Sequence, residues 1–295
     1  MRQPPPLSAC LGYPITTGVA ALAVVATLRW WTGADIERFM IGFDDWWREP
    51  WRLLTPALFH VDLIHLLFNL YWLWVFGSQV EGEFGPGRTL GIYVLLAIGS
   101  ATAEQAVFFG GVGLSGVGYG LFGLLWVLSR TEPRFRDAID RQTIQLLVGW
   151  FFLCIVLTVA NVWKVANVAH GAGFVLGGLL GWTIGARSIP LRLRNGAVLG
   201  TVFLLFVAGG TVAHPYVNLS KEYGPQLAYL GYSALQNGDA KRAAALYERA
   251  VIVDPNVPAW WHNLAIAYDR LGRTDDARDA FSKAASLEPD GPENP

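Results

Sequence analysis

Residues 113–123 of this 295-residue chain read Gly-Leu-Ser-Gly-Val-Gly-Tyr-Gly-Leu-Phe-Gly, a serine followed by glycines that return every two to four positions. A second stretch, residues 169–181, reads Ala-His-Gly-Ala-Gly-Phe-Val-Leu-Gly-Gly-Leu-Leu-Gly and repeats glycine at every fourth position. Stripes of small residues let two membrane helices approach closely, so the two stretches are expected to pack face to face. That packing would bring His170 to Ser115.

The composition of the chain predicts a protein with several membrane spans. Hydrophobic residues make up 53% of the sequence, charged residues only 15%, and the mean hydropathy is positive. Tryptophans gather in residues 29–31, 46–51 and 72–74, as amphipathic rings do at membrane interfaces. The 23 acidic and 22 basic residues nearly cancel, so no surface for nucleic acid is predicted.

A helix needs about 20 mostly apolar residues to cross the hydrocarbon layer, and seven segments meet this requirement. The predicted spans are residues 14–34, 57–77, 89–110, 114–130, 144–162, 166–186 and 195–213. We therefore predict an all-α membrane bundle. It has an N-terminal tail at 1–13, a core of six spans at 14–190 and a seventh span at 191–214.

The positions of basic residues predict the orientation of the bundle, because Lys and Arg accumulate in short cytoplasmic loops. A cytoplasmic amino terminus, and with it a cytoplasmic tail 1–13, fits the sequence best. It leaves only four basic residues in the outer loops, namely Arg38, Arg48, Arg52 and Lys164. Seven spans then place the carboxyl terminus outside the cytoplasm.

After Pro215 the chain becomes polar and rich in alanine, and similar residues recur 34 positions apart. This period is typical of tetratricopeptide repeats (TPR), and it predicts a small helical domain at 222–290 with two repeats. Because two repeats are few, support is expected from a helix near Tyr223, from the membrane domain or from dimerisation. The matched pairs are Leu230 and Leu264, Gly238 and Gly272, Ala243 and Ala277, Tyr247 and Phe281, Ala250 and Ala284, and Pro255 and Pro289.

Polar residues within apolar segments indicate the chemistry. A serine hydroxyl becomes a strong nucleophile when a histidine takes its proton, which makes Ser115 and His170 candidate partners. His65 and Asn69 are four residues apart and share a helix face, so both can join the Ser115 amide as donors to an oxyanion. Packing of a small serine between helices, and hydrogen bonding of polar residues across helices, are the alternatives.

A metal or cofactor site receives little support from the sequence. His60, His65 and His170 are the residue type that zinc prefers, but they do not form a His-Glu-x-x-His pattern, and Asp62 is the one carboxylate close to them in sequence. No glycine-rich loop has the phosphate-binding form. We predict no metal and no cofactor.

Residues 49–182 resemble the rhomboid intramembrane proteases. The likeness is carried by Glu-Pro-Trp-Arg-Leu-Leu-Thr at 49–55, by the segment 59–77, and by the serine and histidine motifs. It implies a Ser115–His170 dyad without a third carboxylate. It also implies oxyanion donors at His65, Asn69 and the Ser115 amide, and packing of Tyr119 on the catalytic imidazole. Gly113 and His60 are included as supporting residues of the site.

The resemblance also implies a function, which is hydrolysis of peptide bonds in or near the transmembrane segment of single-span membrane proteins. The expected location is the bacterial inner membrane, with the TPR domain outside. Repeat surfaces commonly bind peptides, so we expect this domain to bind peptides or proteins, and an inert stalk is the alternative. The lipid bilayer is the other partner, and no nucleic acid is expected. The alternatives are a rhomboid-like membrane-protein binder without activity, and a channel or carrier, which would need charged residues in several spans.

Overall fold

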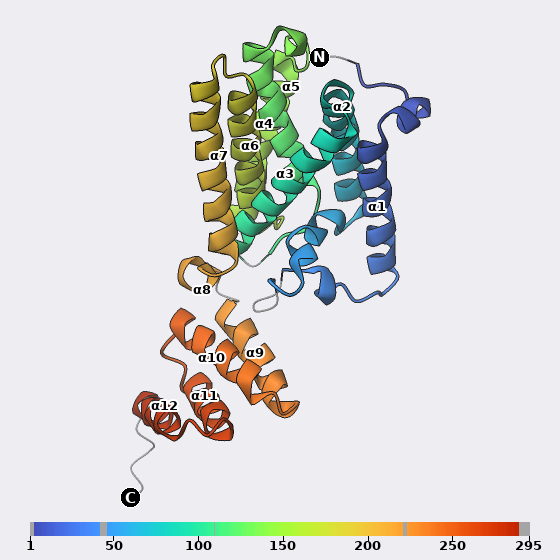
Figure 1. Cartoon of the computed structure of the whole chain (residues 1–295). Helices are drawn as coiled ribbons and strands as arrows, with labels where there is room; N and C mark the ends of the chain where they lie inside the picture. The colour runs from blue at the N-terminus through green and yellow to red at the C-terminus, as the bar shows by residue number, and fades with distance from the viewer. Residues whose placement is uncertain (1–2, 42–45, 109, 221–222, 289–295) are drawn as a thin grey trace, which may run out of the picture. The chain divides into compact units, whose positions relative to one another are not determined.

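The structure is a computed structural model that describes residues 3–41, 46–108, 110–220 and 223–288. All regular elements in these ranges are helices (Figure 1). The chain divides into two compact units, Met1–Val212 and Ala213–Pro295. The all-α fold predicted from the sequence is confirmed.

The first unit contains seven long helices, each lying where a span was predicted. Their bounds are α1 Pro14–Trp31, α2 Leu63–Phe84, α3 Pro86–Val107, α4 Ser115–Thr131, α5 Arg141–Val159, α6 Asn167–Ile184 and α7 Ile189–Gly210. Short 3-10 helices fill the loops at Leu7–Gly12, Glu37–Phe39, Pro50–Leu53, Thr55–Leu58 and Pro133–Phe135.

The predicted start of the second span at residue 57 is wrong, because α2 begins at Leu63. The Asp62 carboxylate accepts a hydrogen bond from the amide of His65 at 2.8 Å, and such an N-cap fixes where a helix starts. His60 therefore lies in the loop before the helix, whereas His65 and Asn69 lie in its first two turns. The seventh helix likewise begins earlier than predicted, since Ser188 caps it.

Four of the seven helices, α2, α3, α5 and α7, are long and apolar enough to cross a membrane on length and composition alone. α4 has only 17 residues, and both α4 and α6 are rich in glycine, which adds little hydropathy. Each of the four helices contains an apolar stretch of 18 residues. Only 17% of this stretch is buried in α5 and 11% in α7, against 56% in α2 and 61% in α3. The outer faces of α5 and α7 are thus left for lipid.

The centre of the first unit is the contact between α4 and α6, which lie side by side in Figure 1. A Cβ atom on Gly173 would overlap the carbonyl oxygen of Gly116, and one on Gly177 would overlap that of Gly120. Conversely, a Cβ on Gly123 of α4 would overlap the carbonyl oxygen of Phe174 on α6. The predicted face-to-face packing of the two glycine stripes is confirmed.

The buried carboxylate of Glu81, near the carboxyl end of α2, holds the first turn of α1. It accepts hydrogen bonds from the amides of Ile15 and Thr16, both at 2.8 Å. These amides have no partner within their own helix, and an unpaired amide is costly where water is absent. Glu81 thus ties α1 to α2.

The second unit consists of the short helix α8 His214–Val217 and two helical hairpins. The hairpins are α9 Tyr223–Gln236 with α10 Ala240–Val253, and α11 Pro258–Arg270 with α12 Thr274–Leu287. Gly238 and Gly272 occupy the two hairpin turns with φ of 77° and 74°, a left-handed conformation that favours glycine. The two predicted repeats are therefore confirmed as α-hairpins.

The ends of the repeat unit differ from one another. Tyr247 is 1% exposed between its neighbours, whereas its counterpart Phe281 is 40% exposed because no described helix follows α12. Tyr223 is the first residue of α9, and the expected flanking helix near it is the short α8, which packs on α10 and whose His214 ring lies 4.1 Å from the Tyr223 ring. Pro289, paired with Pro255 in the sequence, and the predicted domain limits 222 and 290 lie outside the described residues.

We expect Gly177→Ala to lower the free energy of unfolding by about 1–3 kcal/mol, because the added methyl group overlaps the Gly120 carbonyl. Thermal unfolding in detergent measures the effect. Gly200→Ala on α7 is the matched control, since its Cβ would meet no atom within 4 Å. Equal melting temperatures for the two variants would contradict the close approach of α4 and α6.

We expect the second unit to lose stability as the pH falls from about 6.5 towards 4. Burial and the neighbouring Arg249 guanidinium lower the pKa of His214 to about 4, so the folded unit holds a neutral imidazole that is protonated more readily when unfolded. Hydrogen exchange of α9 and α10, corrected for intrinsic rates, should therefore be less protected at pH 5 than at pH 7.5. His214→Gln should remove this pH dependence, and an unchanged dependence in the variant would argue against it.

Candidate active site

Ser115 is the first residue of α4, and the loop before it is held in place by two hydrogen bonds. The amide of Gly113 donates to the carbonyl of Pro56 at 3.1 Å, and the amide of Leu114 donates to Nε2 of His60 at 3.3 Å. Gly113 has a φ of 120° and lies against the His65 ring. A Cβ atom added to Gly113 would be 2.7 Å from Cε1 of His65. A side chain at 113 is excluded on both grounds.

His170, the fourth residue of α6, meets Ser115 directly. Its Nε2 lies 2.7 Å from the Ser115 hydroxyl oxygen, and the residue is 4% exposed. The Tyr119 ring stacks on the imidazole with centroids 4.7 Å apart, and its hydroxyl donates to the Leu147 carbonyl at 3.1 Å. No described residue forms a hydrogen bond with Nδ1 of His170. The structure thus brings Ser115, His170 and Tyr119 together, with no third polar side chain on the imidazole.

His60 is fully buried, and its hydrogen bonds fix its tautomer. The Leu114 amide can only donate, so Nε2 of His60 accepts and the ring proton is on Nδ1. Nδ1 then donates to the Thr27 hydroxyl at 3.3 Å, which donates to the Leu58 carbonyl. A neutral His60 therefore connects α1 to the loop that carries the nucleophile candidate.

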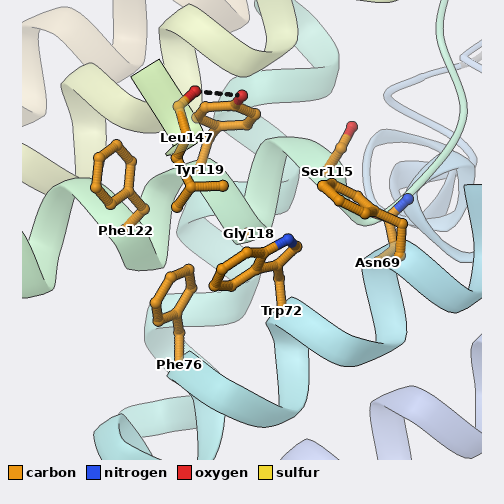
Figure 2. Close-up of a pocket in the computed structure, with 9 residues that line it drawn as sticks. Asn69, Trp72, Phe76, Ser115, Gly118, Tyr119, Phe122 and Leu147 are labelled. Carbon is orange, nitrogen blue, oxygen red and sulfur yellow. Dashed lines mark hydrogen bonds between the residues drawn. The ribbon is translucent and has the colours of Figure 1, made fainter. Parts of the chain in front are cut away.

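Asn69 and His65 take different places around this loop. Asn69 donates one amide hydrogen to the His65 carbonyl at 2.8 Å, which leaves its second hydrogen for another acceptor. Its side chain lies near Ser115 at one end of a cavity (Figure 2). The His65 ring lies against Gly113 and 4.9 Å from the His60 ring, so it reaches the site from the side of the loop.

The cavity beside Ser115 lies between α2, α4 and α5. Its polar groups are at the Ser115 end, and aromatic rings from α2 and α4 line the rest, as Figure 2 shows. An apolar lining with a few polar groups at one end is typical of binding sites for apolar groups. The lining residues are Phe68, Asn69, Trp72, Phe76, Ser115, Gly118, Tyr119, Phe122 and Leu147.

Sequence reasoning missed one polar residue close to the site, Glu104 on α3. Its carboxylate accepts a hydrogen bond from the amide of Ala169, next to His170, and it lines a second cavity that also reaches Ser115. A glutamate inside the predicted span 89–110 is the signal that could have found it, since ionisable residues at membrane depth are usually functional. Within the described residues, no three His, Cys, Asp or Glu side chains are grouped as metal ligands require.

We expect His60→Ala to reduce labelling of Ser115 by a serine-directed fluorophosphonate at least about tenfold, because the buried Leu114 amide loses its acceptor and the loop shifts. His60→Gln should retain more labelling, since its amide oxygen can replace Nε2 as the acceptor. Labelling rates of purified protein in detergent provide the measurement. If the alanine and glutamine variants label at the wild-type rate, His60 does not position the loop.

Comparison with known protein families identifies both parts of the chain. Residues 47–187 match the family model of the Rhomboid domain, and residues 230–295 match that of the tetratricopeptide repeat. The resemblance stated from the sequence, a rhomboid domain followed by a TPR segment, is confirmed. The Rhomboid domain and the apolar helices together make the chain an integral membrane protein.

Proposed function

Since its membrane unit contains a Rhomboid domain, we propose that the chain is an intramembrane serine endopeptidase that cuts single-span membrane proteins in or near their transmembrane segment. The observation that carries the proposal is the 2.7 Å contact between Nε2 of His170 and the hydroxyl of Ser115. A histidine at this distance can take the hydroxyl proton. Both residues lie in the first turns of helices whose glycines bring the two backbones together.

The proposed reaction follows acyl transfer through a serine. His170 takes the proton of the Ser115 hydroxyl while its oxygen attacks the peptide carbonyl carbon. The C–N bond then breaks, and the imidazolium gives its proton to the leaving amine. A water molecule, deprotonated by His170, attacks the acyl ester, which releases the new carboxyl terminus and restores Ser115.

The negative charge on the tetrahedral oxygen would be stabilised by donors on two elements. The amide of Ser115, in the first turn of α4, has no partner inside its helix, and the second amide hydrogen of Asn69 is available. Asn69 lines the same cavity as Ser115, which supports this role. The His65 ring, beside Gly113, is the third candidate donor.

We further propose that the amino terminus is cytoplasmic and the TPR unit extracytoplasmic, in a bacterial inner membrane. Eight of the thirteen arginines in residues 1–212 lie in or beside the turns from α2 to α3, α4 to α5 and α6 to α7, including Arg88, Arg134 and Arg187. The first turns of α4 and α6, which bear Ser115 and His170, are at the opposite ends of those helices. Water would therefore reach the site from outside.

Cleavage of a single-span reporter in proteoliposomes tests the dyad. We expect Ser115→Ala and His170→Ala to abolish cleavage, and Asn69→Ala to lower kcat roughly 10²–10³-fold because one oxyanion donor is lost. All variants should keep the wild-type melting temperature within a few degrees, which shows that they fold.

Equal cleavage by the wild type and both dyad variants would contradict the proposed role of Ser115 and His170. A wild type that binds the reporter tightly but leaves it intact, and whose Ser115 does not react with fluorophosphonate, would favour the alternative of a membrane-protein binder without activity. A label that persists in Ser115→Ala would indicate a different nucleophile.

We propose that the TPR unit binds peptides or proteins and selects substrates for the membrane unit. Stacked α-hairpins commonly bind peptides on their surfaces, and two such hairpins are present. A chain that ends at Ser220 should cut the simple reporter within about twofold of the wild-type rate, but should lose a subset of the cellular cleavage products. Sequencing of new protein termini in cells gives the measurement, with Ser115→Ala as background. Identical products from both chains would make the TPR unit dispensable for selection.

A further inference from the structure

We infer that Glu104 is a positioning residue for His170, holding the start of α6 from the neighbouring helix α3. The inference rests on the proposed function, because it concerns the group that would act as the base. Glu104 is 4% exposed, and its carboxylate lies 65 residues before its partner amide in the chain. The pair therefore forms only when α3 and α6 have packed.

The start of α6 lacks a cap of its own. Ala166 occupies the N-cap position and has no side chain that can accept a hydrogen bond. The amides of Val168 and Ala169 instead donate to the Glu104 carboxylate, the second at 2.9 Å. A buried helix start without partners would be costly in a membrane, so Glu104 determines where α6 can begin.

The position of α6 matters because no described residue orients the imidazole of His170 through its Nδ1 atom. In a Ser-His-Asp triad, a carboxylate orients the histidine through a hydrogen bond to Nδ1. Here no described residue bonds to Nδ1 of His170, and Tyr119 contacts only the ring face. The carboxylate of Glu104 holds the backbone one residue before His170, and so places the ring through the main chain.

The loop before α4 packs closely against Glu104 and the start of α6. A Cβ on Gly111 would lie 2.7 Å from the Ala166 Cβ and 3.3 Å from Cγ of Glu104, so the loop before α4 closes over the carboxylate. One turn earlier on α3, Ser100 packs against Gly116, with its Cβ 2.6 Å from where a Gly116 Cβ would be. One face of α3 thus touches the starts of both α4 and α6.

Glu81 offers a matched control, because it makes the same arrangement elsewhere. It is buried, and it caps α1 by accepting from the amides of Ile15 and Thr16. It lies 12 residues, or about 18 Å along α2, from Asn69. Removing Glu81 should cost a helix cap without moving His170.

The test compares Glu104→Leu and Glu104→Gln with Glu81→Leu and Glu81→Gln in the full-length chain. Reporter cleavage in proteoliposomes gives kcat and KM, fluorophosphonate labelling gives the reactivity of Ser115, and thermal unfolding gives stability. We expect both leucine variants to melt at lower temperature. Only Glu104→Leu should lose kcat and labelling rate on the order of 10²-fold, with KM within about twofold. Glu104→Gln should recover part of the loss, since its amide oxygen accepts from one of the two amides.

The inference is overturned if Glu104→Leu folds and keeps the wild-type kcat and labelling rate, or if Glu81→Leu lowers them equally. If the leucine variants do not fold, the glutamine pair decides: kcat should fall about tenfold or more for Glu104→Gln and stay unchanged for Glu81→Gln. Failure of the proposed function is recognised separately, as a wild type whose cleavage and labelling equal those of Ser115→Ala.

Discussion

The close backbone approach of α4 and α6 is the constraint on which the rest of the membrane unit depends. Lipid chains are as apolar as the helices, so apolar side chains alone give little reason for two helices to associate. Glycine allows the two backbones to touch, at Gly116 with Gly173 and at Gly120 with Gly177, and dispersion contacts then accumulate along the whole face. Ser115 and His170 lie at the same end of this contact, so their meeting follows from it.

Three buried polar residues of the bundle join helices through hydrogen bonds that replace those of water. His60 joins α1 to the loop before Ser115, Glu81 joins α1 to α2, and Glu104 joins α3 to α6. Each of them satisfies amides or hydroxyls that lipid cannot hydrogen-bond. Glu81 and Glu104 lie near the carboxyl ends of their own helices, and each accepts hydrogen bonds from the first turn of a neighbouring helix.

The sequence was sufficient for features that depend on period alone. Glycine every fourth residue defines one helix face, so the contact of Gly173 with α4 could be predicted, and the 34-residue spacing of Gly238 and Gly272 predicted the hairpins. Features that depend on a partner distant in the chain could not be predicted in this way. The partner of Glu104 is 65 residues away. The start of α2 was predicted wrongly for a different reason, because the local Asp62 cap rather than hydropathy determines it.

The unequal attachment of α5 has a consequence for how a bilayer acts on this protein. A membrane that thickens or thins changes the tilt of its helices, and α4 and α6 must tilt together because their backbones are in contact. α5, with 17% of its apolar stretch buried, supplies Leu147 to one wall of the cavity and has no comparable contact. A change in lipid composition would therefore act on the width of the cavity more than on the spacing of Ser115 and His170.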